Sequence, residues 1–341
     1  MRKIFLPVTF LGLAIIVVLS CRKTQNNVSS SISVTSLNQL FSALRSTPQS
    51  LNVIAGRDTI VFGASGTMLH FYSNSFKDAG GSTITSGIVN LQLVEMYNSG
   101  DMICNRATTL ANGNLLTSGG QVHITATMNG QGVYVNTYGV GFIHTNKPLP
   151  GVMTLFYGNT NNGDSVANWN VSDTTKRGNV AELFDTAAAI HSPISISYGR
   201  TWVGYVFDSA SSLEYTNCDA FYFSDSPKVS VSVIMPDNTF TASNTQVYLV
   251  LPDINCAMST VEPQLGSASY DAATNTIKLV SESQTNIVPE GMKYELIVVA
   301  NKNSQYYFYK QSGIIPQNGL AITATMNTDT QADIKSQLST L

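Results

Sequence analysis

Apolar and polar residues alternate with a period of two along much of this chain. In residues 89–93, 122–127 and 229–233 every second side chain is apolar, and those between are Asn, Gln, His, Thr or Ser. Because successive side chains of a strand point to opposite faces of a sheet, this alternation predicts half-buried β-strands.

Turn sequences separate these strands at short intervals. They include residues 77–81 (Lys-Asp-Ala-Gly-Gly), the pair Asn112-Gly113 and residues 129–132 (Asn-Gly-Gln-Gly). Asn-Gly favours two-residue hairpin turns, since both positions need a positive φ. Short strands joined by such turns predict an all-β fold with antiparallel β-sandwich-like domains.

Two segments show helical spacing instead. In residues 36–44 apolar side chains recur every three or four positions, and we expect this short helix to pack against the first β domain. The second predicted helix covers residues 329–340. There Thr330 opens a capping box, and Ile334 and Leu338 lie on one apolar stripe.

The first twenty residues have the layout of a secretory signal. Arg2 and Lys3 precede an apolar run over residues 4–19, and a small residue, Ser20, follows it. A membrane-spanning helix needs about 20 apolar residues, so a retained transmembrane helix is the weaker interpretation.

The sequence at residues 18–21, Val-Leu-Ser-Cys, resembles the lipobox of bacterial lipoproteins. The resemblance implies cleavage before Cys21 and acylation of that cysteine, which makes membrane lipid an expected partner. An ordinary signal peptide ending in a chance cysteine is the alternative. Arg22 and Lys23 follow, and the aspartate that signals inner-membrane retention is missing. We therefore expect an outer-membrane lipoprotein, with the periplasmic side favoured over the cell surface.

These patterns divide the chain into five segments, with one break at the Pro-rich residues 147–151. We expect a lipoprotein signal peptide (1–20), a lipidated tether with a short helix (21–50), a first β-sandwich domain (51–150), an irregular β linker region (151–227) and a second β-sandwich domain with a C-terminal helix (228–341).

Charge is low throughout. Charged residues make up 11% of the chain, against about 25% in an average soluble protein. The formal net charge is −3, and removal of Arg2 and Lys3 with the signal makes it (18 − 2) − 21 = −5. This mild acidity argues against nucleic acid as a partner.

Four cysteines are present, and one of them is assigned to lipid. We interpret Cys104, among apolar neighbours, as a buried small hydrophobic residue. Cys218 and Cys256 are the candidate disulfide pair, because the bacterial envelope is oxidising. None of them lies beside another cysteine or a histidine, so we expect no metal site.

Catalytic patterns do not emerge. The four histidines, His70, His123, His144 and His191, lack metal-ligand spacing, and the carboxylates fall in separate elements. Residues 63–66 (Gly-Ala-Ser-Gly) do not form a nucleophile elbow. Residues 159–164 are rich in oxygen ligands and fit a polar turn better than a calcium loop. We expect no cofactor and no enzyme activity, with a hydrolase whose site is assembled from distant residues as the remaining alternative.

Four aromatic residues are candidates for stacking on a sugar ring or a peptide: Trp169, Trp202, Tyr307 and Tyr309. Residues 306–309 alternate on a predicted strand, so Tyr307 and Tyr309 share one face. Ordinary cross-strand packing of these rings is the favoured alternative.

Several segments, taken in order, resemble a family of uncharacterised outer-envelope lipoproteins of Gram-negative bacteria. They are Gly66-Thr-Met-Leu, Val89-Asn-Leu-Gln-Leu-Val-Glu-Met-Tyr97, Gly100-Asp-Met-Ile, Asn112-Gly-Asn-Leu-Leu-Thr-Ser-Gly-Gly120, Tyr215-Thr-Asn-Cys-Asp-Ala-Phe221 and Val288-Pro-Glu-Gly-Met-Lys-Tyr294. The resemblance implies a fold class and a location but no reaction.

Two resemblances concern the fold alone. The first β domain resembles the sandwich shared by zonula occludens proteins, ankyrins and netrin receptors. Some of these cleave themselves after a histidine, but Thr145-Asn146 follows His144 here and does not match that step. The segment from Val288 resembles transthyretin-like sandwiches. Together the patterns predict a non-catalytic envelope lipoprotein that binds or scaffolds another envelope component, with carbohydrate binding as the alternative.

Overall fold

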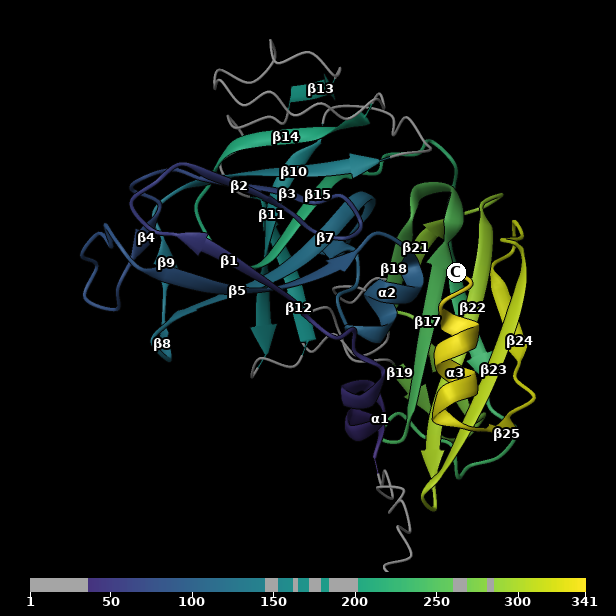
Figure 1. Cartoon of the computed structure of the whole chain (residues 1–341). Coiled ribbons are helices and arrows are strands. Elements are labelled where there is room, and N and C mark those ends of the chain that lie inside the picture. The colour runs from purple at the N-terminus through teal and green to yellow at the C-terminus, as the bar shows by residue number, and fades with distance from the viewer. Residues whose placement is uncertain are drawn as a thin grey trace, which may run out of the picture. The chain divides into compact units, whose positions relative to one another are not determined.

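The computed structural model describes residues 36–144, 153–161, 165–171, 179–183, 202–259, 269–280 and 285–341. The fold is all-β, as predicted, and is built from antiparallel sheets with short helices near both ends of the described chain (Figure 1). The predicted signal peptide and Cys21 lie outside the described residues, as does the Pro-rich break at 147–151. Among the described residues, no helix has the length and apolarity that a membrane span requires.

Two sheets form the first sandwich. One has the order β1 (Gln49–Ile54), β5 (Ile88–Met96), β7 (Asn114–Met128), β15 (Glu214–Phe221), β11 (Thr154–Asn161) and β12 (Ser165–Val171), with β6 (Leu110–Ala111) and β8 (Gln131–Gly132) paired to β7. The other has the order β13 (Asn179–Leu183), β14 (Trp202–Ala210), β10 (Tyr138–His144), β3 (Met68–Phe71) and β2 (Thr59–Phe62). Strands β4 (Phe76–Lys77) and β9 (Tyr134–Val135) form a separate two-stranded sheet.

The core of this sandwich follows from the period-two pattern. Leu91, Ile124 and Leu155 project from the first sheet and share one buried cluster with Leu69 and Phe142 of the second. The alternation in residues 89–93 and 122–127 is therefore confirmed, since the apolar positions are buried and the polar ones face outward.

The second sandwich also has two sheets. One has the order β19 (Ser269–Asp271), β20 (Thr276–Lys278), β16 (Lys228–Ile234) and β21 (Asn286–Pro289), and β24 (Leu320–Thr323) pairs with β16 in parallel. The other has the order β18 (Cys256–Ser259), β17 (Thr245–Leu251), β22 (Lys293–Lys302), β23 (Gln305–Ile314) and β25 (Asn327–Asp329), with a 3₁₀ turn, η1 (Pro252–Ile254), between β17 and β18. Val231, Leu249 and Val298 belong to its core.

Three helices share a core with the second of these sheets. They are α1 (Leu37–Leu44), α2 (Ser99–Cys104) and α3 (Gln331–Leu338). Strand β17 is buried at every position, because Leu249 faces the sandwich core while Tyr248 and Val250 face the helices. A sheet that is apolar on both faces needs such a cover.

The destination predicted for the first helix is wrong. Leu40, Phe41 and Leu44 of α1 are buried against the second sandwich, where the ring of Phe41 lies 5.9 Å from that of Tyr248. The helix itself is confirmed, and the side chain of Ser36 accepts a hydrogen bond from the Gln39 amide at its N-terminus.

The expected linker region is part of the first sandwich. Strand β15 lies between β7 and β11 in the large sheet, and β13 and β14 extend the opposing sheet. Strands β13 and β14 are in the same sheet as β10 and β3 (Figure 1). The described strands of residues 153–221 therefore belong to sheets begun by residues before 144, and they do not form an irregular linker.

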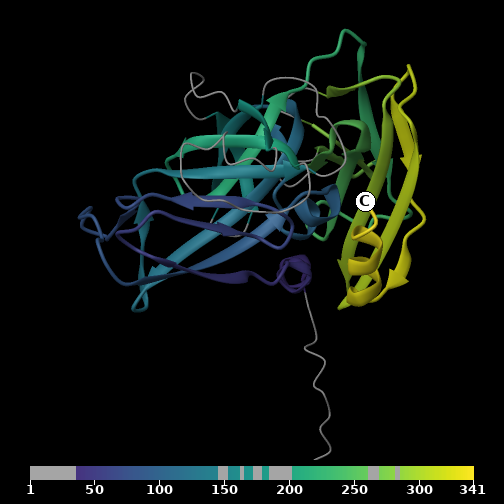
Figure 2. The same ribbon diagram turned by 45° about the horizontal axis from the view of Figure 1, so that its top comes forward.

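Backbone and side-chain contacts join the two sandwiches. The Thr109 amide donates to the Ala257 carbonyl at 2.8 Å, and the Ala257 amide donates to Thr109 Oγ1 at 2.7 Å. Asn255 Nδ2 donates to the carbonyls of Tyr97 at 3.0 Å and Ser118 at 3.3 Å. The described residues from 36 onward accordingly belong to one compact unit, seen from a second side in Figure 2.

Candidate functional site

An uncharged surface runs across three neighbouring strands of the first sandwich. On the outer face of the sheet, Ser50 of β1 pairs with Gln92 of β5, which pairs with Thr125 of β7. One step along, Asn52, Asn90 and Thr127 form a second row in the same register. We call these six residues the neutral face.

The side chains of the neutral face are accessible. Five of the six are exposed and Gln92 is half-buried, with its Nε2 donating to Ser50 Oγ at 3.0 Å. Beside the second row, Ile54 and Ile88 pair across β1 and β5 and are 47% and 59% exposed. The neutral face thus ends on an apolar pair open to solvent.

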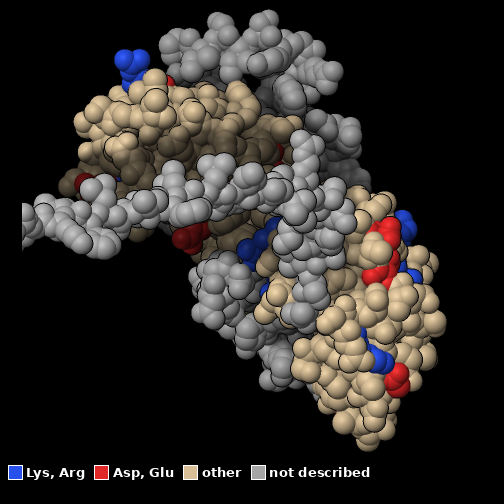
Figure 3. Space-filling view, turned by 60° about the horizontal axis from the view of Figure 1, so that its bottom comes forward, with Lys and Arg blue, Asp and Glu red and all other residues tan. Residues whose placement is uncertain are grey.

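The chemistry of the neutral face suits an uncharged ligand. It offers amides and hydroxyls, which both donate and accept hydrogen bonds, and it has no ionised group. Charged residues are sparse elsewhere as well: few Lys, Arg, Asp and Glu side chains appear on the described surface in Figure 3. The in-register rows, rather than the low charge alone, distinguish this surface.

Trp169, a candidate for ligand stacking, is not available to a ligand. Its side chain is 1% exposed, and its Nε1 donates a hydrogen bond to the Thr108 carbonyl. It packs with Phe156 and Tyr215 on the outer face of the large sheet. The stacking interpretation is wrong for Trp169, and the side chain of Trp202 lies outside the described residues.

Tyr307 and Tyr309 pack against the protein itself. The ring of Tyr307 meets that of Phe240 edge to face at 5.2 Å, and both rings are half-buried or buried against the second core. Tyr309 is also half-buried, and its hydroxyl donates to Gln311 Oε1. Both tyrosines therefore pack against neighbouring side chains of the second sandwich, as the favoured alternative of ordinary packing expects.

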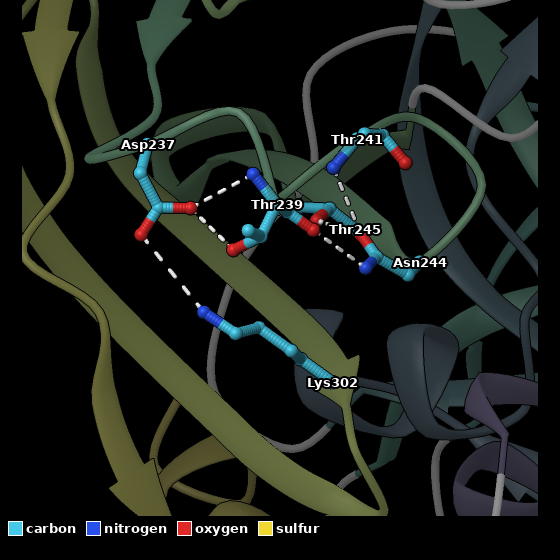
Figure 4. A network of polar contacts seen from close by, with 6 residues as sticks. All are labelled: Asp237, Thr239, Thr241, Asn244, Thr245 and Lys302. Carbon is cyan, nitrogen blue, oxygen red and sulfur yellow. Dashed lines mark hydrogen bonds and ion pairs between the residues drawn. The ribbon is translucent and has the colours of Figure 1, made fainter.

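A polar turn holds Phe240 in place beside Tyr307. Asp237 accepts hydrogen bonds from the Thr239 amide and hydroxyl, and Asn244 accepts from the Thr241 amide at 2.8 Å (Figure 4). Lys302 Nζ lies 3.9 Å from Asp237 Oδ2 and 4.7 Å from the centre of the Phe240 ring. This network is structural, because its polar groups are used on one another.

The candidate disulfide does not form. Cys218 and Cys256 are both buried and form no disulfide, and they belong to the cores of different sandwiches. Each thiol fills space among apolar side chains. Cys104 is also buried, as predicted, and burial raises its pKa to about 12, so it is not a reactive thiolate.

His70 and His123 each contact an aromatic ring. The ring centre of His70 lies 4.5 Å from that of Tyr72, and the ring of His123 stacks on that of Tyr215 with their centres 4.3 Å apart. Burial and then the charge of Arg45 lower the pKa of His123 to about 4, so its ring is neutral at pH 7. Within the described residues, no group of three His, Cys, Asp or Glu side chains could hold a metal ion.

Residues 63–66 form a turn held by Glu95. The carboxylate of Glu95 accepts hydrogen bonds from the amides of Ser65 at 2.8 Å and Thr67 at 2.9 Å, and from Gln49 Nε2 at 2.7 Å. A Cβ at Gly63 would lie 2.5 Å from this carboxylate, which explains the glycine. Glu95 has a structural role here.

The outer face of this sheet also has a buried polar cluster that was not predicted. Gln121, Asn217 and Asp219 are all fully buried, and burial raises the pKa of Asp219 well above its ordinary value. The only hint in the sequence is Gly119-Gly120, which suits a β-bulge. Of the oxygen-rich residues 159–164, the first three belong to strand β11, and residues 162–164 lie outside the described part.

Comparisons with models of protein families, with curated proteins and with solved structures found no match.

Proposed function

We propose that this protein is a lipid-anchored, non-catalytic lipoprotein of the bacterial outer membrane that binds or scaffolds another envelope component. The observation that carries the binding role is the neutral face, an accessible surface of two in-register rows on a β-sheet. Sites built on strands hold their geometry better than sites on loops.

The lipid anchor would connect to the folded part of the chain through helix α1. The lipobox-like residues end at Cys21, and the first described helix, α1, begins at Leu37. Because α1 is buried together with α2 and α3, a tether attached to it would hold the whole compact unit rather than one loose domain. Such an arrangement suits a protein that positions a surface near a membrane.

Replacing Cys21 by Ala tests the anchor. We expect the variant to leave the membrane fraction or to accumulate as an uncut precursor, since no thiol remains to be acylated. A variant that is processed and still sediments with membranes would contradict lipidation. Protease treatment of intact cells tests the orientation, because a periplasm-facing protein survives along with a periplasmic control.

A matched pair of threonines tests the neutral face. Thr127 belongs to it, while Thr323 is an exposed strand residue on β24 of the other sandwich. A photo-crosslinking amino acid at position 127 should give specific adducts in intact cells, and the same group at position 323 should not. Equal adducts at both positions, or none at 127, would contradict a binding role for this face.

A neutral carbohydrate is the second candidate ligand, favoured by the combination of amides, hydroxyls and absent charge on the neutral face. Glycan-array binding by the protein from residue 22 onward checks it. We expect binding that is lost in Thr127→Asp, which adds a charge to the face, and kept in Thr323→Asp. Binding that survives Thr127→Asp would place the glycan elsewhere.

A further inference from the structure

A β-bulge brings three buried polar side chains together between β7 and β15. Asn217 lies opposite Gln121, but Asp219 lies opposite Ser118, so the register shifts by one residue at Gly119-Gly120. Gln121, Asn217 and Asp219 therefore point to the same face of the sheet, and each is 0% exposed. Asn217 Nδ2 donates to Asp219 Oδ2 at 2.5 Å.

The Asp219 carboxyl group also receives hydrogen bonds from the Ser118 side chain and the Gly119 backbone. Three atoms of this cluster are still left without a hydrogen bond in the described structure. They are Gln121 Nε2, Gln121 Oε1 and Asp219 Oδ1. Buried polar atoms are almost always paired with protein or with ordered water, because burial removes their contacts with bulk solvent. A fully buried glutamine with both ends unpaired therefore points to a group that the protein chain does not supply.

The mixture of donor and acceptor atoms identifies that group. A cation would satisfy Gln121 Oε1 and Asp219 Oδ1 but would leave the donor Nε2 unpaired. A calcium ion would also need six or more oxygen ligands. Water accepts from Nε2 and donates to both oxygens, and buried waters typically have two to four such partners.

We propose that ordered water is bound between Gln121 and Asp219 and joins β7 to β15 across the bulge. The site supports the contact between the sandwiches, because the bulge sets the position of Ser118, whose carbonyl accepts from Asn255 Nδ2 of the second sandwich. The raised pKa of Asp219 agrees with this assignment, since a neutral carboxyl group can donate to water as well as accept from it.

A crystal structure of the protein at a resolution that shows ordered water tests the proposal directly. We expect electron density at about 2.7–3.2 Å from the Gln121 amide and from Asp219 Oδ1. An empty site would overturn the proposal. So would density with several oxygen contacts at about 2.3–2.6 Å, which marks a calcium ion.

Thermal unfolding of Gln121→Leu gives an independent test in solution. If water bridges the cluster, the variant strips Asp219 of that water, and Tm should fall by at least about 2–4 °C. If the glutamine is truly unpaired, its removal should leave Tm unchanged or raise it, which would overturn the proposal. Gln92→Leu, on the same face at a half-buried position, is the matched control and should stay near the wild-type Tm.

The same measurement separates water from a cation. Addition of Ca²⁺ or of EDTA should leave the wild-type Tm unchanged. A shift with Ca²⁺ that disappears in Asp219→Asn would show that the cluster binds a cation, against the proposal.

Discussion

Gly100 of α2 lies against the backbone of Leu338 at the end of α3, so closely that a Cβ at position 100 would be 1.9 Å from the Leu338 carbonyl oxygen. Two helices far apart in the sequence therefore meet backbone to backbone. Gly100 also explains why α2 was not predicted, because a short helix that begins Ser-Gly has neither the length nor the pattern of a helical segment.

Gly100→Ala should destabilise the protein. The added methyl group must push α2 and α3 apart, and overpacking of this kind costs about 1–3 kcal/mol. Urea denaturation followed by circular dichroism measures the change. Gly132→Ala is the control, since a Cβ there meets nothing within 4 Å, and equal stability losses in both variants would contradict the contact.

Asp219 should make the protein less stable as pH rises. Its folded-state pKa is raised above the ordinary value of 3.8, chiefly by burial, so its contribution is complete below about pH 4 and is lost as pH rises through the folded pKa. Asp219→Asn keeps a neutral group there. We expect the Tm of this variant, relative to that of the wild type, to increase as pH rises from about 4 to about 8.

Asp237 provides a control of opposite sign. Hydrogen bonds from Thr239 lower its pKa below 3.8, so its stabilisation is present at neutral pH and is lost on acidification. Asp237→Asn should therefore differ from the wild type at neutral pH and converge with it in acid. Parallel pH profiles for Asp219→Asn and the wild type would show that Asp219 has the same pKa in both states.

His123 should weaken the fold in acid. Its pKa falls from 6.5 to about 4 because the ring is buried and lies near Arg45. As pH falls from about 6.5 to about 4, His123 is protonated in the unfolded chain but stays neutral in the folded one. The free energy of unfolding therefore falls by up to about 1.4 kcal/mol per pH unit. His123→Phe keeps the stack on Tyr215 and should lose less stability over this range, as measured by urea denaturation.

The sequence predicted individual strands and helices better than it predicted what they pack against. The alternation in residues 89–93 gave a strand with the right faces, because burial on one side only leaves a period of two. Strand β17 is apolar at successive positions from Val247 to Leu251, without the alternation of a half-buried strand, and both of its faces are buried. That second face is what the first helix covers, so its destination could not be read from the helix alone.

The neutral face could not be predicted from the sequence, because it depends on the pairing of strands that are far apart in the chain. Two strands of the neutral face were predicted, but its rows depend on the register of β1 against β5, which no local pattern contains. The aromatic candidates failed for a related reason. Trp169 lies opposite Gly158 in the β11–β12 hairpin, and only the residues that fold over this face show that it is covered.

Asn255 should be needed for the junction between the sandwiches. Its backbone is left-handed, with φ of 49°, and its side chain donates to the carbonyls of Tyr97 and Ser118. Asn255→Gly keeps this backbone accessible and removes the side-chain contacts, so it isolates their contribution. The substitution also removes the hydrogen bond that Ser99 Oγ donates to Asn255 Oδ1. Loss of these three part-buried hydrogen bonds should cost about 1–3 kcal/mol.

Asn303→Gly is the matched control for this substitution. Asn303 has φ of 53° and is exposed in the hairpin between β22 and β23, so its replacement should leave stability close to that of the wild type. Urea denaturation of both variants measures the difference. If the side chain of Asn255 joins the sandwiches, Asn255→Gly should also broaden the transition or divide it in two, because each sandwich keeps its own core. A single unshifted transition would mean that the backbone contacts of Thr109 with Ala257 hold the junction without it.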